Sequence, residues 1–219
     1  MKKGVLIPIL IICFIVGGFF VIRAMNQADD VALSDGFTKR FLDTTVETDE
    51  GFYYFESGNG KFSMWFPEKY QLNDEQGLYI SKSDYEALFA FQDPGEDNPY
   101  VKSMHVTYYE RNENYAEITW EKMLDEFSYE SHYEKDEQDN KTIYRSVSST
   151  SLDGSTLIIS DPENNPVNFY FALIINNDAD EFVTIRYSLT CPEGAECDPH
   201  SQEEAIFFNT LLENVHFTN

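Results

Sequence analysis

The sequence predicts an α+β fold, a mostly antiparallel sheet with helices packed against it, preceded by one N-terminal transmembrane helix. Three observations lead to this prediction. Short apolar runs with strand-like alternation recur between turn sequences, two later stretches have helical periodicity, and the first two dozen residues are almost entirely apolar. An aromatic content of 16% supplies enough bulk for a hydrophobic core.

The centre of the predicted sheet is a hairpin formed by residues 167–175 and 182–189. The first run (VNFYFALII) is apolar at nearly every position, which predicts a strand covered on both faces. The second (FVTIRYSL) alternates apolar and polar side chains, as a half-covered strand does. The Asn- and Asp-rich residues between them favour a turn.

Two further hairpins are indicated by glycine-containing turns. Gly58-Asn59-Gly60 separates residues 52–57 from 61–66, and Asp153-Gly154 separates residues 142–152 from 155–160. Three more short strands are expected, at residues 77–81, 85–92 and 100–110.

Two helices are expected. One covers about residues 116–129, and its apolar side chains share one helical face: Trp120, Met123, Leu124 and Phe127. The acidic residues 130–140 that follow are expected to be a solvated loop. The second helix begins near Asp198 or Ser201, and its predicted buried stripe consists of Ala205, Phe208, Leu211, Leu212 and Val215.

The N-terminus predicts membrane attachment through residues 4–22. These 19 residues carry no charge, which is close to the roughly 20 residues of a bilayer-spanning helix. Lys2 and Lys3 precede the segment and acidic residues follow Arg23, so the positive-inside rule predicts a single-pass signal anchor with a cytoplasmic N-terminus. The domain organisation is then a transmembrane anchor over 1–23, a juxtamembrane tether over 24–50 and an extracytoplasmic α+β domain over 51–219.

Two alternatives to the uncleaved anchor stay open. A cleaved signal peptide normally has a shorter apolar region followed by a small-x-small site, whereas Arg23 interrupts this sequence. Lipid attachment at Cys13 is the second alternative. Ile11 and Ile12, which precede this cysteine, are not the small residues that such processing prefers.

The charge of the predicted domain is strongly negative. Three of the 15 basic residues (Lys2, Lys3 and Arg23) flank the apolar segment, so 12 basic and 39 acidic residues follow Arg23 and give a net charge of −27. Such a domain is repelled by nucleic acid and by anionic lipid headgroups, which excludes both as partners of the folded part. The acidity is explained either by solubility in a salty exterior or by a cationic or metal partner.

Cys191 and Cys197 are the cysteines expected outside the membrane. An oxidising exterior favours a disulfide between them, with Pro192 and Gly194 forming the short connecting turn. Free thiols and a metal site that includes His200 are the alternatives. Zinc sites usually have tighter ligand spacing and a fourth ligand, which is not evident here.

Calcium is the metal that the acidic turns could bind. Asp161 and Glu163 lie in one turn, and Asp178 and Asp180 lie in another. Neither turn has the glycine and distal glutamate of an EF-hand loop, so ordinary turn residues are the alternative interpretation.

No catalytic or cofactor-binding residue is assigned. The four histidines are scattered, and the sequence has neither a Gly-x-Ser-x-Gly nucleophile motif nor a phosphate-binding glycine loop. With so many carboxylates, acid/base catalysis by any particular pair is not indicated.

Three stretches together resemble the PsbP-like group of extracytoplasmic α/β/α sandwich domains: residues 60–70 (GKFSMWFPEKY), residues 119–127 (TWEKMLDEF) and residues 182–217. In that group a strand with the pattern G-aromatic-S-h-x-h-P opens the domain, and an h-x-x-h-h-x-x-h helix follows the last strand. The matching positions are Gly60, Phe62, Ser63, Trp65 and Pro67, then Phe208, Leu211, Leu212 and Val215. The acidic loop at 130–140 and the cysteine-bearing residues 191–198 depart from the group's pattern. The resemblance implies a non-enzymatic accessory or assembly domain over about residues 51–219.

The leading functional hypothesis is therefore a membrane-anchored extracytoplasmic domain that binds an envelope protein or assists an envelope assembly, without catalysis. Two other classes stay open. One is an extracytoplasmic hydrolase that uses carboxylates, which requires acidic groups converging in an apolar pocket. The other is a calcium-dependent adhesive or sensor domain.

Overall fold

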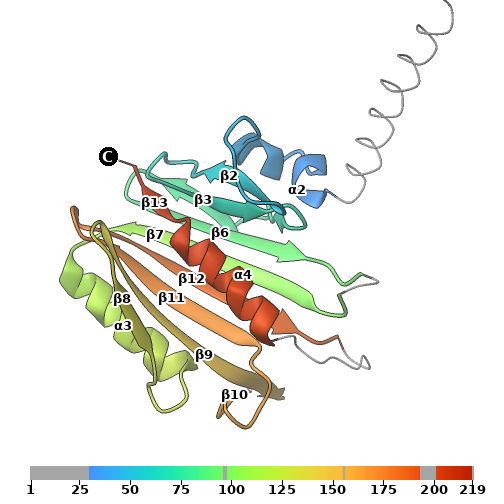
Figure 1. Cartoon of the computed structure of the whole chain (residues 1–219), viewed down its shortest axis with the longest axis vertical. Coiled ribbons are helices and arrows are strands. Elements are labelled where there is room, and N and C mark those ends of the chain that lie inside the picture. Colours follow the sequence, from blue (N-terminus) through green and yellow to red (C-terminus); the bar gives the residue numbers. More distant parts are fainter. Residues whose placement is uncertain (1–29, 96–97, 155, 193–200, 219) are drawn as a thin grey trace, which may run out of the picture.

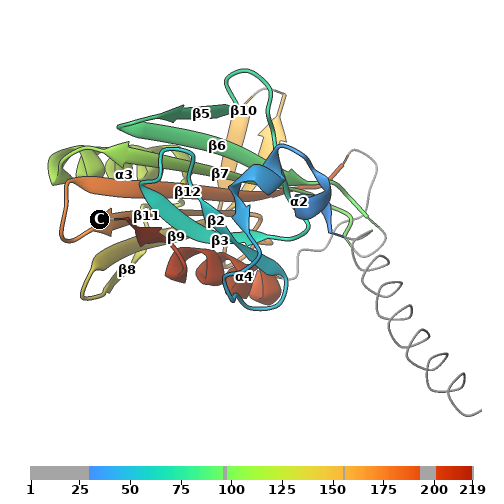
Figure 2. The same ribbon diagram turned by 90° about the horizontal axis from the view of Figure 1, so that it is seen from above.

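The computed structural model describes residues 30–95, 98–154, 156–192 and 201–218. Its elements form three layers (Figures 1 and 2). A nine-stranded antiparallel sheet is the middle layer, helix α4 and a four-stranded sheet cover one of its faces, and helix α3 covers part of the other. The predicted α+β class with mostly antiparallel pairing is confirmed for this part of the chain.

The large sheet runs in the order β10-β9-β11-β12-β7-β6-β4, and the short strands β5 and β8 pair with β6 and β9. Its strands are β4 (Gln71–Leu72), β5 (Tyr79–Lys82), β6 (Tyr85–Gln92), β7 (Val101–Glu110), β8 (Glu134–Glu137), β9 (Lys141–Asp153), β10 (Thr156–Ser160), β11 (Phe169–Asn176) and β12 (Glu181–Thr190). The predicted central hairpin is β11–β12, flanked by β9 and β7.

A second, four-stranded sheet is a feature that the sequence did not predict. It runs in the order β1-β2-β3-β13, with β1 (Leu42–Asp43), β2 (Phe52–Glu56), β3 (Phe62–Pro67) and β13 (His216–Phe217). The predicted hairpin at Gly58–Gly60 is the β2–β3 connection. β13 joins from the far end of the chain by pairing with β3, a contact that no local pattern signals.

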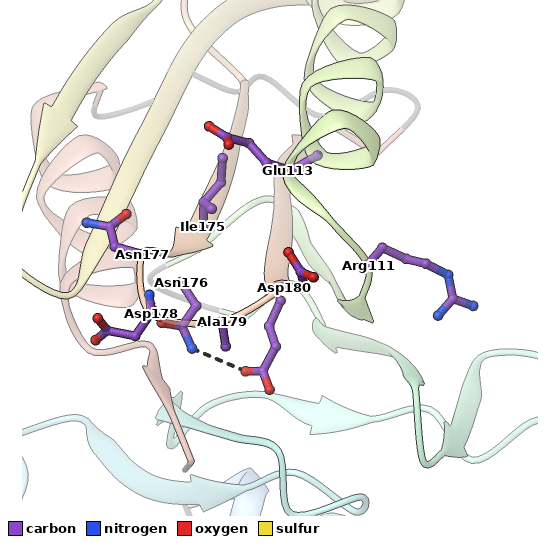
Figure 3. Close-up of a pocket in the computed structure, with 10 residues that line it drawn as sticks. Arg111, Glu113, Ile175, Asn176, Asn177, Asp178, Ala179 and Asp180 are labelled. Carbon is purple, nitrogen blue, oxygen red and sulfur yellow. Dashed lines mark hydrogen bonds between the residues drawn. The ribbon is translucent and has the colours of Figure 1, made fainter.

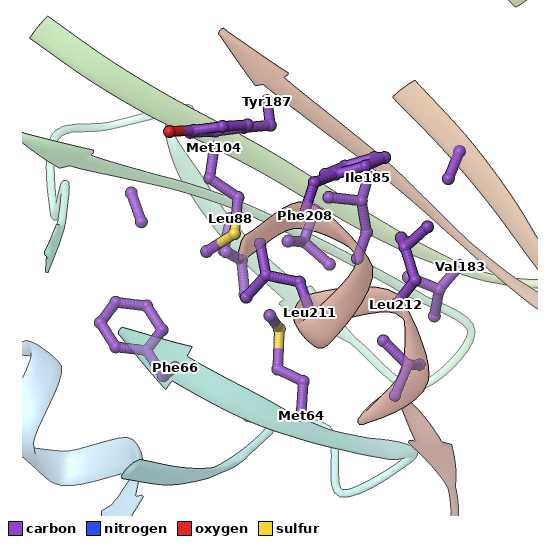
Figure 4. Packing of buried hydrophobic residues seen from close by; sticks show 14 of the residues in the cluster. Met64, Phe66, Leu88, Met104, Val183, Ile185, Tyr187, Phe208, Leu211 and Leu212 are labelled. Carbon is purple, nitrogen blue, oxygen red and sulfur yellow. The ribbon is translucent and has the colours of Figure 1, made fainter. Parts of the chain in front are cut away.

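The main core lies between the large sheet and the layer formed by α4 (Ser201–Glu213) and the small sheet (Figure 4). Phe208, Leu211 and Leu212 of α4 point into it, as predicted, and Val215 is buried just after the helix. Met64 and Phe66 enter from the small sheet, and the large sheet contributes Leu88, Met104, Val183 and Ile185.

The second core lies under α3 (Glu113–Phe127), on the opposite face of the large sheet (Figure 1). Trp120, Met123 and Phe127 pack against Phe171, Leu173 and Phe182. Odd-numbered residues of β11 thus face α3 and even-numbered ones face α4, which confirms the predicted two-sided burial. The helix begins three residues earlier than predicted because the side chain of Asn112 caps it by accepting from the Tyr115 N–H.

Packed elements are already present from Asp30, within the predicted juxtamembrane tether over 24–50. α2 (Val31–Ser34), the 3₁₀ helix η1 (Thr38–Phe41) and β1 all lie in residues 24–50. Ala32 is fully buried in the main core, and the Thr38 hydroxyl accepts from the Leu72 N–H at 2.8 Å. These elements are too short to show a sustained hydrophobic period, so the sequence suggested no more than a short helix over residues 36–42, which overlaps η1. The predicted acidic loop at 130–140 contains the strand β8, which the sequence did not indicate because its four charged residues show no apolar period.

The predicted membrane segment, residues 4–22, lies outside the described residues. Within the described ranges, no helix has the length and apolar character needed to cross a bilayer.

Candidate functional site

The four calcium candidates are not brought together. Asp161 and Glu163 lie between β10 and β11, near the start of β11, whereas Asp178 and Asp180 lie between β11 and β12, at its other end. An eight-residue strand separates the two turns by roughly 23 Å. The Asp161 carboxylate accepts hydrogen bonds from the Glu163 N–H at 2.9 Å and from the Asn164 side chain at 2.5 Å, so it closes its own turn.

A polar hollow of about 480 Å³ surrounds the β11–β12 turn (Figure 3). Asp178 and Asp180 are among the residues that line it, but their carboxylates lie on opposite sides of the turn. Asn176 instead donates from its side chain to Glu181 at 3.3 Å. Across the described ranges, no three His, Cys, Asp or Glu side chains are placed so that they could hold a metal ion together.

Of the predicted disulfide, Cys197 lies outside the described residues, as does His200 of the alternative metal site. Cys191 follows directly after the end of β12. The pairing of the two cysteines therefore stays a prediction.

Glu86 of β6 is a buried carboxylate that joins the two sheets. It is 1% exposed and accepts from the backbone N–H groups of Gly58 and Asn59, each at 2.8 Å. It also accepts from the hydroxyls of Tyr79 at 3.3 Å and Ser81 at 3.0 Å. The β2–β3 turn approaches so closely that a Cβ at position 58 would lie 2.1 Å from the Tyr79 hydroxyl, which explains the glycine.

Lys141 at the start of β9 is a buried ammonium under the end of α4. It is 3% exposed, and its Nζ donates to the carbonyl oxygens of Leu212, Glu213 and Val215 at 3.2, 2.7 and 3.0 Å. Burial lowers the pKa of this lysine. A cation is favoured at a helix C-terminus, where backbone carbonyls lack intrahelical donors, so Lys141 caps α4.

Glu204 forms the third buried polar cluster, in the first turn of α4. Its carboxylate binds Lys102 of β7, with 2.6 Å between Nζ and Oε1, and accepts from the Tyr187 hydroxyl of β12. Burial, together with neighbouring Tyr70 and Glu204, raises the pKa of Tyr187. Tyr70 and Lys102 also line a small hollow of about 360 Å³. The cluster fixes the start of α4 on the large sheet.

His105 of β7 is half-buried, on the large-sheet face opposite the main core. It pairs across the strands with Phe89 and Arg186, and the His105 and Phe89 rings lie 4.5 Å apart. Burial, together with the charge of Arg186, lowers the pKa of His105 to about 4. The imidazole is therefore neutral at physiological pH, and its ring serves as a packing surface.

Each of the four buried charged side chains in the described ranges has partners inside the domain: Asp30, Glu86, Lys141 and Glu204. Their hydrogen-bonding capacity is used to join strands, turns and helix ends. The hydrolase hypothesis, which requires acidic groups converging in an apolar pocket, stays a prediction.

The most apolar of these hollows is a groove of about 500 Å³ between α4 and the β8–β9 pair. Its apolar lining comes from Tyr133, Val147, Tyr170, Ala205 and Phe208. Arg145 of β9 crosses it, binding Glu134 of β8 at 2.8 Å and the Asn209 side chain of α4 at 3.0 Å. The groove thus combines an aromatic lining with a polar, charged rim, a composition typical of binding surfaces.

Exposed apolar side chains continue from this groove along β9 and onto β10. Val147 lines the groove, whereas Leu152 and Leu157 pair across the β9–β10 hairpin on the opposite face of the sheet. Leu152 is 71% exposed, Leu157 40% and Ile158 41%, and Val147 and Tyr133 are also exposed. These five are a majority of the nine large hydrophobic side chains exposed in the described ranges. We call Val147, Leu152, Leu157 and Ile158 the apolar edge. Scattered exposed hydrophobic residues are ordinary, but a group of them at one edge marks an interaction surface.

Sequence reasoning missed this surface, although it placed both strands correctly. The signal available in the sequence is the run Leu157-Ile158-Ile159, which is apolar on both sides of a strand. Such a run predicts a covered strand, yet β10 is the outermost strand of the sheet. Its exposure depends on strand order, which the sequence alone did not supply.

The three-layered arrangement defines the class of protein: an α+β sandwich domain with a groove beside its C-terminal helix. A family model described as "Putative lipoprotein YvcA" matches residues 28–216, and the chain belongs to this YvcA_Mog1p family. The match begins two residues before Asp30, the first residue that the structure describes.

Among solved structures, the chain is similar to the Ran-binding protein Mog1p of Saccharomyces cerevisiae. The identity is 15% and the TM-score 0.41, over 75% of this chain and 94% of Mog1p. No curated protein matches the sequence. The predicted PsbP-like resemblance agrees with the family at the level of a related fold, whereas the family itself is a different one.

Proposed function

We propose that this protein is a membrane-held extracytoplasmic domain that binds another protein through the groove beside α4 and the adjoining apolar edge. The observation that supports this most directly is the concentration of exposed apolar side chains at one edge of a domain that is otherwise strongly acidic. A soluble acidic domain gains nothing from leaving Leu152 and Leu157 in water, whereas a binding surface requires such groups.

Binding fits the described site better than catalysis does. The four buried charged groups of the described ranges are committed to structural hydrogen bonds. Glu134 is already paired with Arg145, and Glu163 lies beyond the end of β10. The groove therefore provides a concave aromatic surface with a charged rim, which suits recognition of a partner.

Membrane attachment is the second part of the proposal. The family description names a lipoprotein, and residues 4–22 have the length of a bilayer span. Lipid on Cys13 and an uncleaved helix are two distinct anchors that place the domain on the same side of the membrane. The family favours the first, and the uninterrupted apolar length favours the second.

Metabolic labelling with an alkyne fatty acid separates the two anchors. Lipid attachment predicts a labelled band that disappears in Cys13→Ser, together with release of the variant from the membrane pellet. A helical anchor predicts no label and retention of both chains after alkaline washing. A soluble form found outside the cell for the unchanged chain contradicts both.

Site-specific photocrosslinking in the native membrane tests the binding surface. A photoreactive amino acid is placed at Val147 in one chain and, as the matched control, at Ile118 of α3, which is also exposed but lies on the opposite side of the large sheet. We expect a discrete adduct from position 147 and none from position 118. Equal adducts from both positions, or none from position 147, contradict the proposal.

A further inference from the structure

The edge strands of the large sheet differ in how they are protected against pairing with another chain. β8 (EKDE) is charged at every position and β5 (YISK) ends in Lys82, whereas β10 (TLIIS) has no charge at all. β10 pairs only with β9 among the described strands, so its outer edge presents unpaired backbone N–H and C=O groups. Charged side chains on an edge strand are a common protection against such pairing, and β10 lacks them.

The side chains of β10 suit addition of another strand. Leu157 lies opposite Leu152, and Ile158 lies opposite Ser151, so apolar groups are exposed on both faces of the β9–β10 hairpin. An added strand would place alternate side chains beside Leu157 on one face and Ile158 on the other. Backbone hydrogen bonds then supply affinity and these two apolar contacts supply register.

Acidic side chains bracket this neutral strand. Asp153, directly opposite the first residue of β10, is exposed, and Asp161 and Glu163 follow its last residue. A second copy of this chain fits poorly, because antiparallel pairing of two β10 strands brings Asp153 of one copy toward Asp161 and Glu163 of the other. The net charge of −27 on each domain adds to that repulsion.

We propose that β10 receives an extended segment of a different protein, in which a short run of consecutive apolar residues, presenting apolar side chains to both faces, is flanked at both ends by lysine or arginine. This inference rests on the proposed binding function and names the chemistry of its partner. The apolar run covers Leu157 and Ile158, while the basic ends face Asp153 and Glu163.

The test uses the full-length chain in a nonionic detergent and two labelled peptides, KTVVVTK and its acidic counterpart ETVVVTE, whose three consecutive valines place apolar groups on both faces. Binding is followed by fluorescence polarisation. We expect saturable binding of the basic peptide that weakens with added salt, and at least about tenfold weaker binding of the acidic one, since two exposed ion pairs are replaced by two like-charge contacts.

Charge reversal provides the decisive variant. Asp153→Lys/Glu163→Lys should exchange the preference, so that the acidic peptide binds more tightly than the basic one. Leu157→Ser/Ile158→Ser should lose both peptides while circular dichroism stays unchanged, and Val46→Ser, at an exposed apolar residue before β2, should lose neither.

Two results overturn the inference and leave the proposed binding function standing. One is the absence of basic-peptide binding while position 147 still gives a crosslinked adduct in the membrane. The other is a concentration-dependent dimer in sedimentation that Leu157→Ser/Ile158→Ser abolishes, because it makes a second copy the occupant of the edge. Loss of the crosslinked adduct itself counts against both proposals.

Discussion

The interior and the outer edge of this domain place polar and apolar groups in opposite ways. In the interior, Glu86 and Lys141 are charged and almost fully buried, yet each has several hydrogen-bond partners. On the β9–β10 hairpin, Leu152 of β9 and Leu157 of β10 are apolar and exposed, and the described part of the chain does not cover them. Burying a charge and exposing a large apolar group are both unfavourable unless something compensates them.

The comparison shows which of these unfavourable groups are compensated by contacts within the domain itself. For the buried charges it comes from the domain's own turns and helix ends, so their role is structural. For the apolar edge it has to come from outside the domain, which is the reason to assign binding there. Substitutions of the buried charges should therefore lower the stability of the domain. Substitutions in the apolar edge should instead weaken partner binding and leave stability nearly unchanged.

The largest effect is expected for Glu86→Ala. Two backbone N–H groups of the β2–β3 turn and two hydroxyls lose their common acceptor, and the free energy of unfolding should fall by about 3 kcal/mol. Urea denaturation measures this loss. Glu86→Gln keeps one acceptor oxygen and is the matched control, with a smaller expected loss. A change below about 1 kcal/mol in Glu86→Ala would show that the turn does not depend on this carboxylate.

Lys141→Met should have the next largest effect. Methionine preserves most of the side-chain volume but leaves three carbonyl oxygens at the end of α4 without their donor, and we expect a loss of about 2 kcal/mol. Hydrogen exchange should accelerate in the last turn of α4 more than in α3. Uniform acceleration across both helices would contradict a capping role.

The half-buried His105 predicts a pH dependence of stability. Its pKa is about 4 in the folded protein and near 6.5 when unfolded, so the unfolded chain binds the proton more readily between these values. Stability from this group is complete above pH 6.5 and is lost as the pH falls toward 4. Because the ring is partly exposed, we expect a loss on the order of 1 kcal/mol.

Replacement by a side chain that does not titrate measures this contribution. The difference in unfolding free energy between the unchanged chain and His105→Gln should shrink as the pH is lowered from 7 to 4.5. A difference that is constant over this range would mean that His105 titrates alike in both states.

The smallest effect on stability is expected at the apolar edge. Leu157→Ser removes an exposed side chain, so the unfolding free energy should change by no more than about 0.5 kcal/mol. Photocrosslinking from position 147 should nevertheless be lost in this variant. A destabilisation comparable to that of Glu86→Ala would show that Leu157 belongs to the core, and the contrast between interior and edge would fail.

Much of the fold followed from local patterns in the sequence. The alternation in residues 167–175 and 182–189 predicted the central hairpin and the direction of its side chains, and the stripe at Phe208, Leu211 and Leu212 predicted the buried face of α4. Such patterns are readable because a strand or helix long enough to bury one face repeats its apolar residues with a fixed period. The turns at Gly60 and Gly154 were equally local, since both residues have positive φ.

What the sequence left undetermined depends on contacts between distant segments. β1, β4 and β13 have two residues each and show no period, so their places are set by the strands that they pair with. Glu86 meets Gly58 across 28 positions and Lys141 meets Leu212 across 71, and nothing near either residue indicates the partner. The candidate binding surface likewise depends on how distant segments are arranged in the sheet. The run Leu157-Ile158-Ile159 is visible in the sequence, but only the order of strands puts it at an edge, because burial is a property of the assembled layers.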